Sequence, residues 1–485
     1  MDLKELASKA IKGELDLTFK HHPVHSFVDG STEIQDNLLA FKGIAGFFVL
    51  DTGSGLVMLD AGHLIDIERA YEEIRKWRPN EPLVAAIFTH HHVDHIFAVE
   101  KFDEEALSDG NDRPTVYANK LMPEHFDRYL KTLGWNTAIN RRQFAINVPH
   151  FTWPEKYRYP DVLVESKTSF TVGDTEFLLN PARGETDDHL WAFIPNEKIL
   201  LPGDLFIWAV PNGGNPQKVQ RYVSDWADAL REMSELEAEI MLPGHGYPMF
   251  GKENIQKALT TTAEFLDEIE NQVMELMNQG KTLNFIIHKV EFKKNLMELP
   301  WLKPVYDDPE FLIRMIWRRY GGWWEGEYDR LFPAKRSVEA SLWIDLVGSL
   351  DVVITKAIEL SNQNEHRLAA HLIETAFYSD PSNSKVHEAR DTIYASFSKK
   401  QTSSMGRNIL NHASLASKEG LRDLAEQKDY FDPKSIASFI TTIGILFFIG
   451  KAIFPVRHIS LSSSNESSPL HLGHTRISRS FFEII

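Results

Sequence analysis

The chain has 485 residues, a formal net charge of −17 and no cysteine. A chain of this length is expected to form two to four domains, each with its own core. Because 69 acidic residues outnumber 52 basic ones, the average field repels phosphate and argues against nucleic acid as a partner. Without thiolates, any metal ion must be held by His, Asp or Glu. The sequence does not open with a basic segment followed by an apolar one. We therefore predict no secretory signal, and a cytoplasmic location or one on a membrane facing the cytoplasm.

The first half of the chain alternates apolar runs with turns. The runs 45–50 and 56–59 flank the turn Asp51–Gly55 and predict a β-hairpin. Apolar residues recur at helical spacing from Asp66 to Trp77, which predicts an amphipathic helix. The run Leu83–Phe88 then predicts a buried strand.

The second half is predicted to be helical. A long helical pattern covers about 252–280, and helices with short breaks continue to about Tyr430. Asp380-Pro381 ends one of these helices, and the next begins near Lys385 and runs to Phe397. This antiparallel pair resembles a single tetratricopeptide-like hairpin, although packing on the catalytic domain or on a second subunit explains it better.

The residues after the strand 83–88 have the spacing of a metal site. His90, His92, Asp94 and His95 lie within six positions of one another. Metal ligation needs imidazole or carboxylate donors that converge about 2 Å from one ion, and a loop that leaves a strand end brings side chains to one point. The alternative is a solvated, histidine-rich turn.

Three further donors lie beside apolar runs. Glu185 precedes one predicted strand, Asp204 ends a second, and His245 ends a third. Strand, helix and strand, with donors at strand ends, fit an αββα sandwich whose site lies along one sheet edge.

The order of these motifs resembles the metallo-β-lactamase superfamily of zinc hydrolases. The resemblance implies two divalent metal ions, with zinc expected. It assigns His90, His92 and Glu185 to one ion, Asp94, His95 and His245 to the second, Asp204 as the bridge between them, and Asp60 as a supporting residue.

Glu185 stands where the superfamily usually has a histidine, which resembles the alkyl sulfatase branch. The stretches 140–142, 245–254, 319–326, 368–373 and 380–383 are also similar to that branch. The branch implies a homodimer formed through an all-α helical domain. We predict an N-terminal extension at 1–30, a catalytic α/β domain at 31–280, a helical dimerisation domain at 281–430, and a hydrophobic segment with a flexible tail at 431–485.

The donor set predicts the chemistry. Two ions about 3.5–4 Å apart lower the pKa of a water between them, so that hydroxide attacks the substrate at neutral pH. Asp94 and Asp204 are the expected catalytic carboxylates. Together with Glu185 they cancel three of the four positive charges of a zinc pair, which makes Mn²⁺ or Fe²⁺ more competitive.

The expected substrate is a small amphiphilic alkyl sulfate. In the sulfatases, an asparagine and an arginine bind the sulfate oxygens. Asn212 matches the asparagine, although Pro211–Asn215 also makes a good turn. Gln217 stands at the arginine position, so Lys218 or Arg221 would supply the charge. Asp204, where those enzymes have glutamate, is a second departure.

Other polar residues have weaker assignments. His91 is expected to be structural, and His189 to support the Glu185 turn. Arg183 would bind the substrate anion or screen Glu185. His21, His22 and His25 form a loose cluster, and the aromatic stretch 151–160 is either a loop over the site or a surface turn.

A hydrophobic segment near the C-terminus leaves a further alternative open. Ile436 to Val456 contains a single charge, Lys451, and is either a membrane anchor or a buried or interfacial helix. The sequence therefore predicts a binuclear alkyl sulfate hydrolase. The alternatives are a thioester, lactone or phosphoester hydrolase with the same site, and a non-catalytic dimeric scaffold on a membrane.

Overall fold

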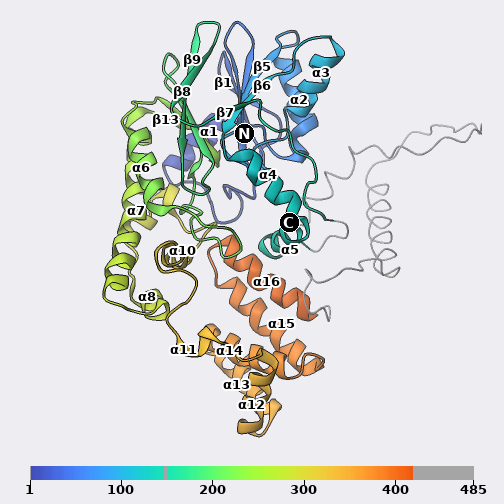
Figure 1. Cartoon of the computed structure of the whole chain (residues 1–485), viewed down its shortest axis with the longest axis vertical. Helices are drawn as coiled ribbons and strands as arrows, with labels where there is room; N and C mark the ends of the chain where they lie inside the picture. Colours follow the sequence, from blue (N-terminus) through green and yellow to red (C-terminus); the bar gives the residue numbers. More distant parts are fainter. Residues whose placement is uncertain (1, 147–150, 419–485) are drawn as a thin grey trace, which may run out of the picture.

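The computed structural model describes residues 2–146 and 151–418, and two β-sheets lie face to face in it (Figure 1). The first sheet has the strand order β1 (Thr32–Gln35), β2 (Leu38–Lys42), β3 (Gly46–Asp51), β4 (Leu56–Leu59), β5 (Leu83–Ile87), β6 (Thr115–Asn119) and β7 (Val162–Val164). The second has the order β13 (Met249–Phe250), β12 (Ile240–His245), β11 (Ile199–Ile207), β10 (His189–Ile194), β9 (Thr175–Ala182) and β8 (Thr168–Val172).

Helices cover the outer faces of both sheets (Figure 1). On the first sheet lie α2 (Ile67–Trp77), which follows the short η1 (Leu64–Asp66), and then α3 (Glu100–Ser108) and α4 (Met122–Lys131). Helix α5 (Leu133–Phe144) follows α4 and lies at the end of the sandwich nearest the helical region (Figure 1). On the second lie α6 (Val223–Ser234) and α7 (Lys252–Asn278). The predicted αββα sandwich is confirmed, as is the helical region that follows it.

Alternation of side chains explains why the central strands are apolar throughout. In β3, Phe48 and Leu50 join the core between the sheets, whereas Phe47 and Val49 join the core under α2 and α3. Successive side chains of a strand point to opposite faces, so a strand covered on both sides buries every residue.

Parallel pairing places the metal-type residues at one edge of the sandwich. Strands β4 and β5 are parallel, and so are β11 and β12. The carboxyl ends of parallel strands meet at the same edge of their sheet, which brings the segments after Leu59 and Ile87 together in the first sheet and Asp204 and His245 together in the second.

The helical region has a core of its own, built from α13 (Leu350–Asn362), α14 (His366–Ser379) and α15 (Ser384–Lys399). It extends away from the sandwich and returns through α16 (Ser404–Lys418), which packs against α5 (Figure 1). The preceding elements are α8 (Leu283–Lys289), α9 (Lys294–Met297), η2 (Pro300–Leu302), α10 (Pro309–Gly321), α11 (Tyr328–Leu331) and α12 (Arg336–Val347). Because α14 ends at Ser379, the stop predicted at Asp380-Pro381 is confirmed.

The N-terminal residues pack on the sandwich. Helix α1 (Leu3–Ile11) buries one apolar face against the core between the sheets, and Asp2 caps its first turn. All three N-terminal histidines contact distant segments. His21 Nδ1 lies 3.2 Å from the Tyr247 hydroxyl, the ring of His22 contacts the Val305 carbonyl at 3.0 Å, and that of His25 contacts Ser404 at 3.0 Å. The contacts of His22 and His25 tie the N-terminal residues to the helical region.

The structure changes one predicted strand end and does not describe the predicted hydrophobic segment. The strand predicted to end at Asp204 continues to Ile207, because irregular register between β11 and β12 turns Asp204 towards the site without ending the strand. The predicted hydrophobic segment 436–456 and the tail lie outside the described residues. No helix within 2–146 or 151–418 is long and apolar enough to cross a bilayer.

Candidate metal centre

The histidine-rich loop follows β5 and is held in place by Asp60, which follows β4. Asp60 Oδ1 accepts the Thr89 backbone N–H at 2.8 Å, and Oδ2 contacts Thr89 Oγ1 at 2.9 Å and His95 Nδ1 at 2.8 Å. Asp60 is fully buried and adopts φ = 55°, which aspartate tolerates better than most residues. Because a carboxylate only accepts, His95 carries its proton on Nδ1 and presents Nε2 as the donor for a metal.

Four side chains form the first donor group: His90, His92, Glu185 and Asp204. His90 Nε2 lies 2.9 Å from His92 Nδ1, 3.6 Å from Glu185 Oε2 and 3.8 Å from Asp204 Oδ2. His92 Nδ1 lies 3.4 Å from Glu185 Oε2. All four residues except His92 are buried.

The second donor group contains Asp94, His95 and His245. His245 Nε2 lies 3.4 Å from Asp94 Oδ2, and its Nδ1 donates to the Ile44 carbonyl at 2.8 Å. Asp204 joins the two groups, with Oδ1 3.4 Å from His95 Nε2 and Oδ2 3.3 Å from His245 Nε2. The structure thus brings together all seven residues that the sequence proposed as metal ligands.

Two glycines allow this close approach. A Cβ on Gly244 would lie 2.0 Å from Asp204 Oδ1, and a Cβ on Gly203 would lie 2.6 Å from Thr89. Gly203 also has φ = 56°, a conformation that glycine adopts without steric cost. A side chain at either position would push Asp204 or the histidine loop out of the site.

The donor set fits divalent metal ions. Tetrahedral ligation with bonds of 2.0–2.1 Å places neighbouring donors about 3.3 Å apart, close to most of the separations above. Three buried donor atoms of the set have no hydrogen-bond partner within the described chain: His95 Nε2, Glu185 Oε2 and Asp204 Oδ1. Buried polar atoms are rarely left unsatisfied, so the lack of a partner for these three atoms fits a site that binds cations.

The charges of the site support the same conclusion. Burial alone would lower the pKa of His95, but Asp204, Asp60 and Asp94 outweigh burial and raise it to about 10. The carboxylates therefore attract positive charge to the point where the donors converge. A metal ion satisfies this demand better than a proton does, because it binds several donors at once.

The three predicted substrate residues have different partners. Arg221 Nη1 donates to Glu185 Oε1 at 2.5 Å and to the Asn212 carbonyl, and Asn212 Nδ2 donates to the same Glu185 oxygen. Burial alone would raise the pKa of Glu185, but Arg221 and His92 hold it well below the usual value. Arg221 and Asn212 therefore fix Glu185, whereas the ammonium group of Lys218 lies over the ring of Trp153, 5.5 Å from its centroid.

A third cluster backs the histidine loop and was only partly foreseen. His91 Nδ1 donates to Asp188 Oδ1 at 2.8 Å, and Asp188 Oδ2 accepts the His91 backbone N–H at 3.0 Å. His91 Nε2 accepts from Arg128 Nη2 at 3.1 Å, and the His91 ring packs on His125. His189 stacks on His90 with the ring centroids 4.4 Å apart. Arg128 has no motif signal, because only the tertiary fold brings α4 to this loop.

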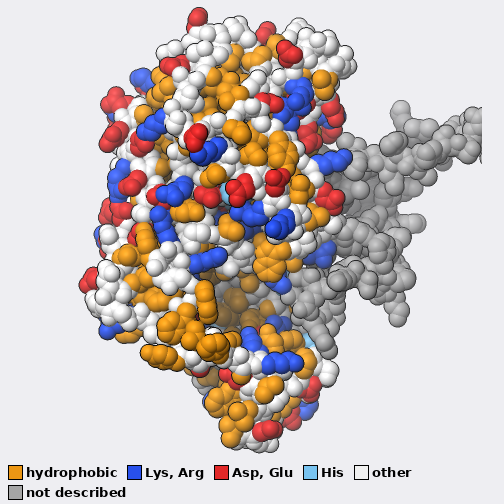
Figure 2. Space-filling model, viewed as in Figure 1, with side chains coloured by type: hydrophobic (Ala, Val, Ile, Leu, Met, Phe, Trp, Pro, Cys, Tyr) orange, Lys and Arg blue, Asp and Glu red, His pale blue; other side chains and the backbone are white. Residues whose placement is uncertain are grey.

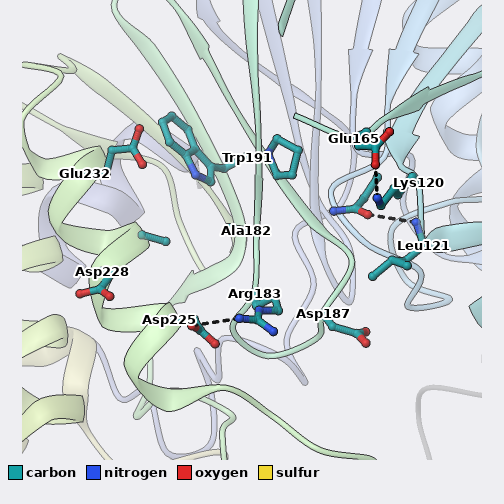
Figure 3. A pocket seen from close by; sticks show the side chains of 13 residues that line it. Lys120, Leu121, Glu165, Ala182, Arg183, Asp187, Trp191, Asp225, Asp228 and Glu232 are labelled. Carbon is teal, nitrogen blue, oxygen red and sulfur yellow. Dashed lines mark hydrogen bonds and ion pairs between the residues drawn. The ribbon is translucent and has the colours of Figure 1, made fainter. Parts of the chain in front are cut away.

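A pocket of about 400 Å³ is lined in part by Arg183 and Asp187, which lie on either side of Glu185 in the sequence (Figure 3). None of the seven donors lines this pocket. Its charged walls pair with each other or with neighbours: Lys120 binds Glu165, Arg183 lies 3.4 Å from Asp225, and Asp187 binds His125. Arg183, a candidate for substrate binding, lies in this pocket.

Comparison with known proteins assigns two regions of the chain to known families. Residues 45–245 match the family model of the metallo-beta-lactamase superfamily, and residues 282–420 match that of alkyl sulfatase dimerisation. A linear primary-alkylsulfatase of Pseudomonas sp. is 24% identical over 385 residues, which cover 75% of this chain and 71% of the relative. An (R)-specific secondary-alkylsulfatase of Pseudomonas sp. is 22% identical over 385 residues, covering 73% and 58%. An alkyl/aryl-sulfatase of Saccharomyces cerevisiae is 21% identical over 397 residues, covering 75% and 59%.

A solved structure shares the fold. The stereoselective inverting sec-alkylsulfatase Pisa1 of Pseudomonas sp. superposes with a TM-score of 0.74 at 21% identity, over 81% of this chain and 66% of that chain. The present chain thus spans between 58% and 71% of the three curated relatives.

The fold and the family match place residues 45–245 in the metallo-β-lactamase superfamily, with two groups of side chains that could hold divalent metal ions. Within the superfamily, the chain belongs to the alkyl sulfatase branch, because the lactamase-like domain is followed by the alkyl sulfatase dimerisation domain.

Proposed function

We propose that this chain hydrolyses alkyl sulfate esters with two divalent metal ions. The main support for this proposal is that seven His, Asp and Glu donors converge into two groups, and that Asp204 lies close to both. A non-catalytic scaffold has no need for this arrangement, since burying the carboxylates of Glu185 and Asp204 without cations is costly.

The chain's own residues would hold and orient the ions. His90, His92 and Glu185 would bind one ion, and Asp94, His95 and His245 the other, with Asp204 between them. When bound, the ions activate water and neutralise charge on the substrate. Asp60 and the Ile44 carbonyl orient His95 and His245, and Arg221 keeps Glu185 ionised and in place.

Zinc is our proposal for both ions, because imidazole and carboxylate donors at these separations suit it. The three carboxylates Asp94, Glu185 and Asp204 reduce the net charge of the site. Manganese or iron(II) therefore competes more strongly than at a site richer in histidine.

The substrate is proposed from the relatives named above, which are alkylsulfatases and an alkyl/aryl-sulfatase. The test is release of sulfate from a medium-chain alkyl sulfate by the full chain, with His92→Ala as the control. Sulfate release by the wild type and its loss in the variant support the proposal. Turnover of a thioester, lactone or phosphoester in place of the sulfate ester would assign a different bond to the same site.

We also propose that the chain forms a homodimer through its helical domain, which we place after α7, from about residue 281. Only Ala340 of helix α12 is buried, while Leu342, Trp343 and Leu346 are 57%, 53% and 70% exposed. Hydrophobic side chains also gather on the surface around α11 (Figure 2). A helix that is apolar on its exposed side needs a partner surface, and the match to a dimerisation domain favours a second copy.

A further inference from the structure

The loop between β11 and α6, residues 208–222, carries two side chains that hold the proposed metal ligand Glu185. Asn212 Nδ2 and Arg221 Nη1 both donate to Glu185 Oε1, and Arg221 also donates to the Asn212 carbonyl. Residues 208–222 form neither a helix nor a strand. The conformation of the loop therefore depends on the segments that pack against it, and the position of the Glu185 carboxylate depends on the loop.

The helical region, which matches the alkyl sulfatase dimerisation family over residues 282–420, binds this loop at three points. The three hydrogen bonds join the Val210 N–H to the Lys303 carbonyl at 3.0 Å, the Gly214 N–H to Asp307 Oδ2 at 2.7 Å, and Gln220 Nε2 to the Met315 carbonyl at 3.1 Å. The bond to Asp307 lies two residues from Asn212. Asp307 has no exposed surface, and its other oxygen accepts the Asp308 N–H at 2.8 Å.

The loop lies so close to the start of α10 that Gly214 has no room for a side chain. A Cβ there would lie 2.3 Å from the Phe311 carbonyl carbon and 2.4 Å from the Leu312 backbone nitrogen. Neither atom can move unless the helix moves. At the neighbouring Gly213, the close contact of a Cβ would be with the end of the Leu312 side chain, 2.4 Å away, which can rotate. The backbone of Gly214 thus rests directly on α10.

We propose that Asp307 is a positioning residue for Glu185, because it holds Gly214 on the helical region and so fixes the loop from which Asn212 and Arg221 bind the Glu185 carboxylate. This inference rests on the proposed function, in which Glu185 is a ligand of the first ion. It gives the helical region a part in metal binding, in addition to the proposed contact between two copies of the chain.

The test measures zinc binding by full-length Asp307→Ala and Gly214→Ala, which break the same contact from opposite sides. Gly213→Ala is the matched control for the loop, because the Leu312 side chain can yield to it. Arg390→Met is the control for the helical region: it removes a buried group whose hydrogen bonds go to α14 and α16.

Each ion is followed separately by placing these changes in two backgrounds. His245→Ala leaves the first donor group intact, and His92→Ala leaves the second. Zinc affinity is measured by chelator competition and melting temperature by circular dichroism. The single variants are also assayed for sulfate release from decyl sulfate.

We expect Asp307→Ala and Gly214→Ala to weaken zinc binding in the His245→Ala background by about 10- to 100-fold, the usual effect of removing a residue that orients metal ligands from outside. In the His92→Ala background, zinc affinity should change by less than about threefold. Gly213→Ala should bind zinc like the wild type. Arg390→Met should lower the melting temperature and leave zinc affinity unchanged.

Other results separate the positioning role from the proposed function. If the wild type binds two ions and both Asp307→Ala and Gly214→Ala keep zinc affinity within about twofold, the positioning role is wrong and the function stands. If Arg390→Met weakens zinc binding as strongly, the effect is a general loosening of the helical region, and the positioning role is again overturned. If the wild type binds two ions but releases no sulfate, while the variants lose the first ion, the positioning role stands and the substrate is wrong. A wild type that binds no zinc overturns both. Should one of the two variants fail to fold, the other decides.

Discussion

Replacement of Arg221 by methionine tests whether this arginine stabilises Glu185. The two side chains are 2% and 1% exposed, and the contact between Nη1 and Oε1 is 2.5 Å long. Removing one partner of a buried ion pair costs about 3–5 kcal/mol, because the remaining charge stays buried without compensation. A domain of 150–250 residues loses about 2–4 °C of melting temperature per kcal/mol. The metal-free variant should therefore melt roughly 6–20 °C below the metal-free wild type.

Metal ions change the size of this effect. A bound cation neutralises Glu185 directly, so the deficit of the variant should shrink after metal is restored. The assay is thermal unfolding followed by circular dichroism, first with a chelator and then after reloading with zinc. Arg183→Met is the matched control: it removes an arginine that is half exposed and lies 3.4 Å from Asp225, and such surface pairs contribute less than about 1 kcal/mol. If metal-free Arg221→Met melts within about 3 °C of the wild type, Arg221 does not stabilise Glu185 and is available to the substrate.

Three further predictions follow from individual contacts. Asparagine tolerates the left-handed backbone of residue 60, but Asp60→Asn removes the charge that orients His95. Chelator competition should therefore show a loss of metal affinity of about 10- to 100-fold. An unchanged affinity would refute the supporting role of Asp60. Burial raises the pKa of Asp307 to about 7, so its contribution to stability is full below about pH 4 and is lost as pH rises to 7. Urea unfolding of Asp307→Asn should lack this dependence, and an identical pH profile would contradict the assignment. Leu346→Glu on α12 should convert the dimer to monomer in analytical ultracentrifugation, and a dimer of undiminished affinity would place the interface elsewhere.

Local sequence patterns predicted the parts of the site that local geometry determines. The donors from His90 to His95 lie on one loop, and their spacing alone indicates a metal site. The donors Glu185, Asp204 and His245 each lie in or beside an apolar strand. Strands β11 and β12 are parallel and β10 runs antiparallel to β11, so the segment before β10 lies at the same edge as the later parts of β11 and β12. The alternation of Phe47 with Phe48 between two cores is likewise a property of any strand covered on both faces.

Side-chain partners across the fold could not be read in the same way. The sequence leaves Lys218 and Arg221 equivalent as candidates for the substrate anion, because both are cations in one loop. The structure separates them, since Arg221 turns inward to Glu185 while Lys218 faces Trp153. The sequence gives no signal for Arg128, because its contact with His91 spans 37 positions and depends on how α4 packs.

The number of metal ions per chain tests the central claim most directly. Elemental analysis of purified protein should find two divalent ions per chain in the wild type, and close to none in Asp204→Ala, which removes the carboxylate shared by both donor groups. His92→Ala should lose the ion of one group and His245→Ala that of the other. A wild type without bound metal, or an Asp204→Ala variant that retains two ions, would contradict the binuclear centre on which the proposed hydrolysis depends.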